Sequence, residues 1–379
     1  MATKKLFGAL LLSVLFAFTS CIQEEALNAE CDIIAFDETW LEENKSLFSA
    51  TPIIPNSLPT ELFVYFKEGT SIDTIKSKEP RFKLTHGATI EKTDTTDNGN
   101  NGIIISYRTT SQDGMYHRDY KVYLTVRTWI KRGKPFSFES YEPEQKGRYN
   151  IWYEEDDGTK LYWWASGNAG IAIINPKTYP TEVEENGYNG KCVKLETCKT
   201  NKTAATYGGM PIAAGNIFLG EFDSSNAMGN ALASTRFGLQ IVPGKPHSLR
   251  GWYKYTPGET FTNKAQEIIY ERRDTCAIYS VLYEVDATNF VPLDGNDVLT
   301  NERIVMVAEL DNPGEPQEWT EFEIPYVTRN GKTFDAEKLK NGEYAITVVA
   351  SSSKDGAHFE GAIGSRLYVD ELEIIWEDE

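Results

Sequence analysis

The sequence predicts an all-β chain, in which an N-terminal immunoglobulin-like β-sandwich is followed by a larger β-jelly-roll sandwich. Short apolar runs recur through the chain and are separated by clusters of Gly, Pro, Asn and Asp, which is the pattern of strands and turns. Beyond the N-terminus, only residues 335–340 suggest a helical turn. With 40% hydrophobic and 12% aromatic residues, the 379-residue chain can bury more than one core.

The N-terminus has the order of residues found in an export signal. Two lysines precede an apolar stretch from Leu6 to Phe18, and a serine comes directly before Cys21. The stretch of about 13 residues is shorter than the roughly 20 that a membrane-spanning helix needs. We expect residues 1–20 to be a lipoprotein signal peptide, Cys21 to carry the lipid and residues 21–50 to be a tether. A plain signal peptide or an uncleaved anchor is the alternative.

An acidic pair, Glu24 and Glu25, follows the cysteine and resembles the surface-export signal of Bacteroidetes lipoproteins. We therefore expect the protein to be anchored in the outer membrane and displayed on the cell surface. An acidic tether that remains in the periplasm is the alternative.

The charge balance limits the range of partners. The formal net charge is −18, and it becomes −20 when the two lysines of the signal are removed. So acidic a protein repels phosphate backbones and anionic membrane surfaces. We expect no nucleic-acid partner, and contact with a membrane only through the lipid on Cys21.

Residues 51–137 have the strand spacing of an immunoglobulin-like sandwich. Their apolar runs alternate with turn clusters over about 100 residues. The expected strands are residues 61–66, 88–92, 102–107 and 121–126.

Residues 138–379 form a second and larger unit that follows a proline at position 135. Its many strands fit two antiparallel sheets packed as a jelly roll, a fold that limits open sheet edges. The expected strands are residues 191–196, 247–255, 277–285, 304–308, 320–324, 344–349 and 366–374.

Several separated motifs in the second unit resemble one family. The last strand, Gly364 to Ile374, is similar to the closing strand of carbohydrate-binding jelly rolls. The more specific motifs are residues 163–168 (WWASGN), 179–181 (YPT), 211–216 (PIAAGN), 220–223 (GEFD), 253–259 (YKYTPGE) and 351–353 (SSS). In this order they resemble the putative carbohydrate metabolism domain family of Bacteroidetes lipoproteins. The resemblance implies an immunoglobulin-like domain followed by a jelly roll with a sugar pocket.

A sugar site requires aromatic platforms for the C–H faces of the rings, beside groups that form hydrogen bonds with the hydroxyls. Trp164 lies in an aromatic-rich segment, residues 152–164, and Asn168 follows it. Both are candidates for the wall of such a pocket. The alternative is that these rings belong to the core.

Strand alternation selects further candidates. In residues 249–255, one face carries Arg250, Trp252 and Lys254 and is the predicted ligand face. In residues 277–285, the set Tyr279, Val281, Tyr283 and Val285 is the predicted buried face, which leaves Ile278, Ser280, Leu282 and Glu284 opposite. Glu284 is then a candidate hydrogen-bond acceptor. Its alternative, like that of Arg250 and Lys254, is a solvated charge on a sheet.

The sequence requires no cofactor, although a structural calcium ion is a candidate near the last strand. Asp370 is the carboxylate that would bind it together with backbone carbonyls. The favoured alternative is a buried Asp whose oxygens accept hydrogen bonds from loop amides.

The function predicted from these observations is the capture of an oligo- or polysaccharide by the jelly roll, as an accessory to carbohydrate metabolism and beside glycan-uptake proteins. A glycoside hydrolase that uses a carboxylate pair in the same pocket is the first alternative. Pairs at strand spacing are Glu371 with Glu373 and Glu321 with Glu323. A structural or adhesive surface protein is the second alternative.

Overall fold

The computed structural model describes residues 27–49, 51–52, 54, 60–67, 69–97, 102–126, 130–144, 146–156, 159–174, 176–222, 230–240, 242–286 and 290–378. Cys21 and the acidic pair after it lie outside these residues, so their predicted roles stay predictions. Among the described residues, no helix has the length and apolarity needed to cross a bilayer.

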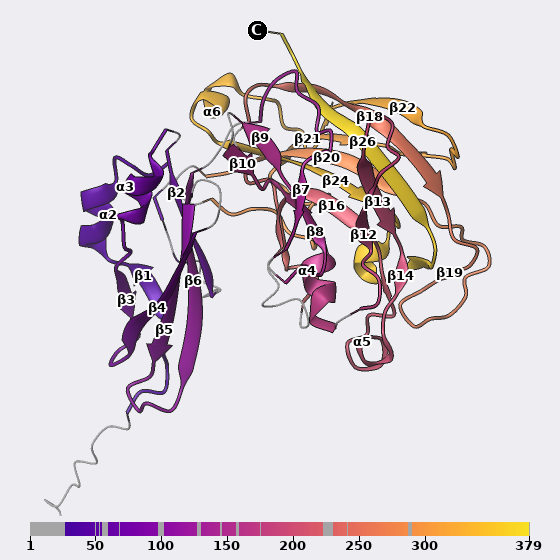
Figure 1. The fold of residues 1–379 in the computed structure, drawn as a ribbon. Helices are drawn as coiled ribbons and strands as arrows, with labels where there is room; N and C mark the ends of the chain where they lie inside the picture. Colours follow the sequence, from indigo (N-terminus) through magenta and orange to yellow (C-terminus); the bar gives the residue numbers. More distant parts are fainter. Residues whose placement is uncertain are drawn as a thin grey trace, which may run out of the picture.

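The described chain is dominated by strands, which confirms the all-β prediction, and it forms a smaller and a larger unit (Figure 1). In the smaller unit a four-stranded sheet has the order β2-β6-β5-β4, with β2 parallel to β6 and the other neighbours antiparallel. These strands are β2 (Glu61–Phe66), β4 (Thr89–Asp97), β5 (Gly102–Thr110) and β6 (His117–Val126). A two-stranded ribbon and two short helices complete the unit: β1 (Ile33–Phe36), β3 (Phe82–Leu84), α2 (Glu38–Asn44) and α3 (Ile72–Lys76).

The N-terminal core begins earlier in the chain than we expected. Ile33, Phe36, Trp40 and Phe48 are all buried in it, so most of the segment assigned to the tether belongs to the folded unit. The Asp37 side chain accepts a hydrogen bond from the backbone N–H of Trp40 and begins α2. The helix was missed because its 7 residues are too few to show a helical period.

The larger unit consists of two packed sheets. The seven-stranded sheet has the order β11-β16-β24-β20-β21-β23, with β17 beside β16, and the five-stranded sheet has the order β12-β13-β26-β18-β22. The first contains β11 (Trp164–Ala165), β16 (Asn216–Phe222), β17 (Thr235–Phe237), β20 (Ala277–Glu284), β21 (Ile304–Glu309), β23 (Val327–Thr328) and β24 (Tyr344–Ser351). The second contains β12 (Thr181–Glu184), β13 (Cys192–Glu196), β18 (Pro246–Thr256), β22 (Thr320–Pro325) and β26 (Arg366–Trp376).

Shorter elements surround the two sheets. The small ribbons are β7 (Tyr141–Pro143) with β8 (Asn150–Trp152), β9 (Glu154–Asp156) with β10 (Thr159–Leu161), β14 (Cys198–Lys199) with β15 (Ile212–Ala213), and β19 (Phe261–Thr262) with β25 (Gly361–Ala362). The helical turns are α4 (Asn168–Ile171), η2 (Ala172–Ile174), α5 (Lys202–Tyr207), α6 (Ala336–Lys340) and η3 (Gly356–His358). The helix α6 confirms the helical turn predicted there.

The main core lies between the two sheets. In β18, Leu249, Tyr253 and Tyr255 are buried whereas Arg250 is exposed, which confirms the predicted alternation of this strand. The alternation predicted for residues 277–285 is only half right. The expected buried set is buried beneath loops on the outer face of the sheet, and Ile278, Ser280 and Leu282 are buried as well, because Ile278 and Leu282 face the main core between the two sheets.

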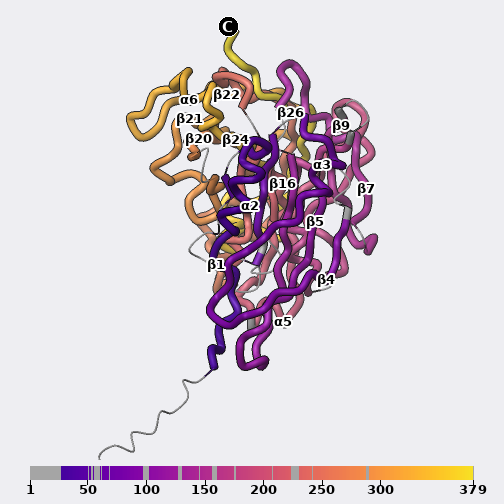
Figure 2. The backbone as a smooth tube through the Cα atoms, turned by 90° about the vertical axis from the view of Figure 1, so that its left-hand side faces the viewer, coloured from indigo at the N-terminus to yellow at the C-terminus, as the bar shows by residue number. Residues whose placement is uncertain are grey.

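Aromatic side chains of the first unit contact strand β17 and a loop of the second. The Phe63 ring lies 4.7 Å from the Arg236 guanidinium carbon, and the rings of Tyr65 and Phe290 meet edge to face at 5.9 Å. Figure 2 shows the indigo strands of the first unit in front of the jelly roll. The first unit therefore packs against β17 and against the loop that contains Phe290.

Candidate functional site

The outer face of the five-stranded sheet carries a cluster of aromatic rings around the predicted ligand strand β18. We call Tyr188, Trp252, Lys254, Trp319 and Tyr368 the aromatic face. Tyr188 stacks on Trp252 with ring centroids 3.8 Å apart and an interplanar angle of 9°. The Trp319 ring meets Tyr188 edge-on at 6.3 Å. Tyr188 is nevertheless 46% exposed, so the stack presents ring surface to solvent.

Lys254 joins the two ends of the aromatic face. Its ammonium nitrogen lies 4.7 Å from the centroid of the Trp319 ring and 4.8 Å from that of Tyr368. A cation over a ring face is attracted by the negative face of the π system. The ammonium group therefore lies between a ring of the loop before β22 and a ring of β26 and is attracted to both.

Asp370 fixes the turn that carries Tyr188. Its Oδ2 accepts hydrogen bonds from the backbone N–H groups of Tyr188 at 2.8 Å and Asn189 at 3.0 Å, and its Oδ1 accepts one from Glu371 at 2.8 Å. The side chain is completely buried, and this burial raises the pKa of Asp370 to about 6 against the lowering effect of the three N–H groups. Gly187 leaves room for the carboxylate, because a Cβ there would lie 2.8 Å from Asp370 Oδ2.

A shallow groove beside the stack provides polar groups. Glu321 lies opposite Trp252 in the β18–β22 pairing and is exposed. Glu371 accepts a hydrogen bond from the Asn189 side-chain amide at 3.0 Å. Arg250 donates to Glu373 Oε2 from Nε at 2.9 Å and from Nη2 at 2.6 Å. The groove is lined by Pro135, Tyr188, Asn189, Arg250, Gly251, Trp252, Glu321, Glu371 and Glu373.

The structure brings together three of the six residues predicted to bind carbohydrate, Arg250, Trp252 and Lys254. Trp164 lies elsewhere and is only 5% exposed. Its ring packs against Phe136 and Phe138, and its indole N–H donates to Glu154 at 3.0 Å. Trp164 is therefore a core residue, as the alternative interpretation held, because β11 is covered by the segment that joins the two units.

Asn168 and Glu284 are also apart from the aromatic face. The Asn168 side chain is buried, donates to the carbonyl of Thr181 at 2.7 Å and accepts from its N–H at 3.2 Å, so it joins α4 to the start of β12. Glu284 forms ion pairs with Lys332 and Lys338. Its partial burial opposes ionisation, but these two ammonium groups lower the pKa of Glu284 below its usual value.

The surroundings of Asp370 match the interpretation of a carboxylate satisfied by loop amides. A calcium ion requires oxygen ligands, whereas both oxygens of Asp370 face N–H donors. Among the described residues, no group of three or more His, Cys, Asp or Glu is placed to hold a metal ion.

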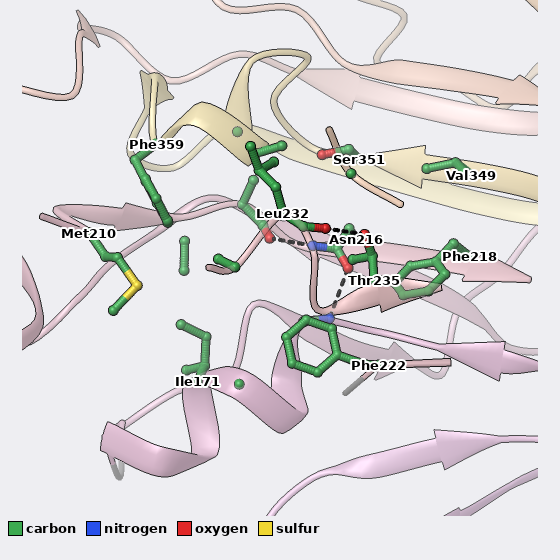
Figure 3. A pocket seen from close by; sticks show the side chains of 18 of the residues that line it. Ile171, Met210, Asn216, Phe218, Phe222, Leu232, Thr235, Val349, Ser351 and Phe359 are labelled. Atoms are coloured by element: carbon green, nitrogen blue, oxygen red, sulfur yellow. Dashed lines mark hydrogen bonds between the residues drawn. The ribbon is translucent and has the colours of Figure 1, made fainter. Parts of the chain in front are cut away.

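A second hollow lies on the other side of the jelly roll, on the outer face of the seven-stranded sheet (Figure 3). We call it the apolar cavity. It has a volume of about 190 Å³, and α4, α5, η3 and strands β15, β16 and β24 contribute to its wall. The large apolar side chains that line it include Ile171, Met210, Phe218, Phe222, Leu232 and Phe359.

Most of the polar side chains in the wall of the apolar cavity bond to the protein itself. Asn216 accepts from the N–H of Gly167 at 2.8 Å and donates to the carbonyl of Ala214 at 3.2 Å. The hydroxyl of Thr235 donates to the Leu232 carbonyl at 2.8 Å. Ser351 donates to the carbonyl of Ser353 at 2.9 Å, and Thr200 to that of Met210.

Sequence reasoning missed this cavity, although a signal for it was present. The motifs at residues 163–168, 211–216 and 351–353 contribute Gly167, Asn216 and Ser351 to its wall. That these three motifs meet at one cavity could be seen only once the fold was known. Tyr188, Trp319 and Tyr368 were missed because they come from a turn, a loop and another strand, so no single periodic pattern contains them.

The chain resembles two crystal structures over long stretches. One is described as a putative glycoside hydrolase from Bacteroides thetaiotaomicron; it is 37% identical, the match covers 94% of this chain and 100% of that chain, and the TM-score is 0.69. The other is described as a putative glycoside hydrolase from Bacteroides vulgatus; it is 37% identical, with 65% of this chain and 100% of that chain covered and a TM-score of 0.59. No curated protein matches the chain.

A sequence profile described as "putative carbohydrate metabolism domain" matches residues 137–375, which is most of the chain and nearly all of the jelly-roll unit. The jelly roll, the motifs along it and this match agree, and the chain belongs to the putative carbohydrate metabolism domain family.

Proposed function

We propose that the protein captures glycans on the aromatic face of its jelly roll, as a lipid-anchored accessory to carbohydrate metabolism. The observation that carries the proposal is the exposed stack of Tyr188 on Trp252 beside a groove of carboxylate, amide and guanidinium groups. The family and the two similar structures agree with a role in carbohydrate metabolism.

The stack suits the apolar part of a sugar. A pyranose ring presents a flat patch of C–H groups, which packs against the face of an aromatic ring. Tyr188 offers such a face because its other side is occupied by Trp252. The Asp370 hydrogen bonds hold the backbone of this turn, so little conformational entropy is lost when a ligand binds.

The groove suits the polar part of a sugar. Hydrogen bonds that involve a charged group are about twice as strong as neutral ones. Glu321 and Glu371 provide acceptors for hydroxyl groups, and Arg250 is partly exposed while paired with Glu373. Glu321 lies on β22 and Glu371 on β26, the two strands that flank β18, so we expect a sugar stacked on Tyr188 to direct hydroxyl groups to carboxylates on either side of Trp252.

Glycoside hydrolysis is the second candidate, favoured by the descriptions of the two similar structures and by the carboxylates in the groove. Hydrolysis requires a carboxylic acid with a raised pKa that reaches the glycosidic oxygen. Asp370 has a raised pKa, but it is buried and both of its oxygens are engaged by backbone N–H groups. Asp370 is therefore not placed to protonate a glycosidic oxygen, and binding without cleavage is the function that we propose first.

The location of the protein is part of the proposal. The signal before Cys21 and the acidic pair after it support a lipid anchor in the outer membrane with display on the cell surface. A surface position would place the aromatic face where polysaccharides arrive, beside glycan-uptake proteins. Protease treatment of intact cells tests this, since a periplasmic protein would survive while a surface marker is lost.

A glycan array together with a reducing-end assay tests the binding function. The chain from residue 22 onward, without signal and lipid, should bind at least one polysaccharide and release no new reducing ends from it. Tyr188→Ala should lose this binding, whereas Tyr270→Ala should keep it, because Tyr270 is 86% exposed and does not belong to the aromatic face. Equal binding by both variants would refute the site, and release of reducing ends would establish the hydrolase instead.

A further inference from the structure

The apolar cavity is a built hollow whose chemistry differs from that of the aromatic face. Its large side chains Ile171, Met210, Phe222, Leu232 and Phe359 are all half-buried, so they surround an opening that solvent reaches. Figure 3 shows them projecting toward a common space from α4, from strand β16, from the turn before β17 and from the loops before β15 and after η3. Partly exposed apolar side chains gathered at one place are unusual for a surface and mark a site of interaction.

Small residues keep the interior of the cavity open. Ala213 and Ala214 of the PIAAGN motif, Gly356 of η3 and Ala277 of β20 all line it. Their backbones pack closely, since a Cβ at Gly356 would lie 2.3 Å from the Cβ of Ala214. Because the backbone on this side is already in contact, the cavity cannot close by a simple approach of η3 to β15.

The hydrogen bonds of the wall decide which ligand fits. The side chains of Asn216, Thr235, Ser351 and Thr200 each bond to a backbone group. A sugar placed there would lose hydrogen bonds to water and would gain few from these groups, at a cost of about 1–3 kcal/mol for each polar group left unpaired. A hydrocarbon group loses no hydrogen bonds and gains contact with the apolar wall.

We propose that the apolar cavity binds a small hydrocarbon group of about the size of one aromatic ring, either as a free molecule or as the apolar substituent of a larger ligand. Its volume of about 190 Å³ agrees with this size, because an apolar protein cavity of about 150 Å³ is known to hold benzene. This inference does not depend on the glycan-binding function of the aromatic face, which lies on the other sheet.

Methyl NMR of the chain from residue 22 onward tests the proposal with toluene as the probe. With ¹³C-methyl methionine, the Met210 signal should shift in a saturable way as toluene is added. The signal of Met115 should not shift, because this exposed residue lies in the first unit. Absence of any saturable shift at Met210 would overturn the proposal.

Two matched variants test the location of the bound probe. Ala213→Leu fills the cavity and should weaken toluene binding about tenfold or more, since the added carbons occupy the ligand's place. Ala169→Leu is the control, because Ala169 lies in α4 but does not line the cavity. If Ala213→Leu fails to fold, Ile171→Ala provides the test by enlarging the cavity, and it should improve binding of butylbenzene relative to toluene. If Ile171→Ala bound butylbenzene and toluene with the same relative affinity as the wild type, the proposal would be contradicted.

Competition by sugars with and without an apolar substituent distinguishes a free hydrocarbon ligand from an apolar substituent on a larger ligand. Phenyl glucoside should displace toluene if the cavity accepts a substituent on a sugar, and toluene alone should bind if it accepts only free molecules. Displacement by glucose itself would overturn the proposal, because the cavity would then be a sugar site. Ala213→Leu should leave glycan binding at the aromatic face unchanged, so failure of this inference and failure of the proposed function give different results.

Discussion

The Tyr188 ring lies parallel to the Trp252 ring at a centroid distance of 3.8 Å, although one residue comes from a turn and the other from the middle of β18. The two are brought together by Asp370. This residue lies opposite Trp252 in the β18–β26 pairing, and its side chain accepts a hydrogen bond from the backbone N–H of Tyr188. A buried carboxylate thus positions an exposed ring.

Trp252→Ala removes the support beneath Tyr188 as well as one ring of the aromatic face. We expect the affinity for a bound glycan to fall about tenfold, which corresponds to about 1.4 kcal/mol. Isothermal titration calorimetry with a polysaccharide that the wild type binds measures this loss of affinity. The far-UV circular dichroism should stay unchanged because Trp252 lies outside the core. Equal affinities of the variant and the wild type would remove Trp252 from the site.

Asp370→Ala leaves three backbone N–H groups without their acceptor. An unpaired buried donor costs about 1–3 kcal/mol, and because these three donors are only part-buried we expect the free energy of unfolding to fall by roughly 3 kcal/mol in total. Denaturant titration measures this. Asp370→Asn keeps one acceptor oxygen and should lose less. A variant that is as stable as the wild type would show that the turn does not depend on this carboxylate.

The raised pKa of Asp370 predicts how stability changes with pH. The folded state binds this proton up to a pH of about 6, whereas an ordinary Asp releases it near 3.8. The stabilisation from the proton is therefore complete below pH 3.8 and is lost as pH rises through about 6, at about 1.36 kcal/mol for each unit of pKa difference. The free energy of unfolding of the wild type relative to Asp370→Asn should fall over this interval. A difference that rises with pH would contradict the raised pKa.

The N–H donors around Asp370 also predict the response to calcium. A bound ion would raise the melting midpoint by mass action. We expect the same midpoint in calcium and in chelator, measured by differential scanning fluorimetry. A higher midpoint in calcium that is lost in Asp370→Asn would support the calcium site predicted from the sequence.

Trp164→Phe tests the assignment of Trp164 to the core. The variant leaves the buried Glu154 carboxylate without the indole N–H, and burial already raises the pKa of Glu154. We expect a loss of about 1–3 kcal/mol in the free energy of unfolding and no change in glycan affinity. Loss of glycan binding with unchanged stability would return Trp164 to the binding site.

The sequence was sufficient for features that depend on local periodicity. The alternation in β18 separates Arg250, Trp252 and Lys254 from the core and is visible in the sequence because one face of this strand is open. It fails in β20, where both faces are buried, and Glu284 at its end was therefore placed in the wrong surroundings, since it pairs with Lys332 and Lys338.

The remaining features depend on contacts between distant residues. The place of Tyr188 in the site depends on Asp370, and the role of Asn168 depends on Thr181. The early start of the N-terminal core depends on Trp40, which packs against Phe48 with ring centroids 5.3 Å apart. These relationships are fixed by the tertiary fold, so composition and spacing along the chain do not contain them.

A crystal structure of the chain in complex with an oligosaccharide that it binds on the glycan array tests the central claim most directly. The account predicts a sugar ring packed on the exposed face of Tyr188, with hydroxyl groups directed to Glu321 or Glu371. A sugar bound in the apolar cavity, or anywhere away from Tyr188 and Trp252, would contradict it.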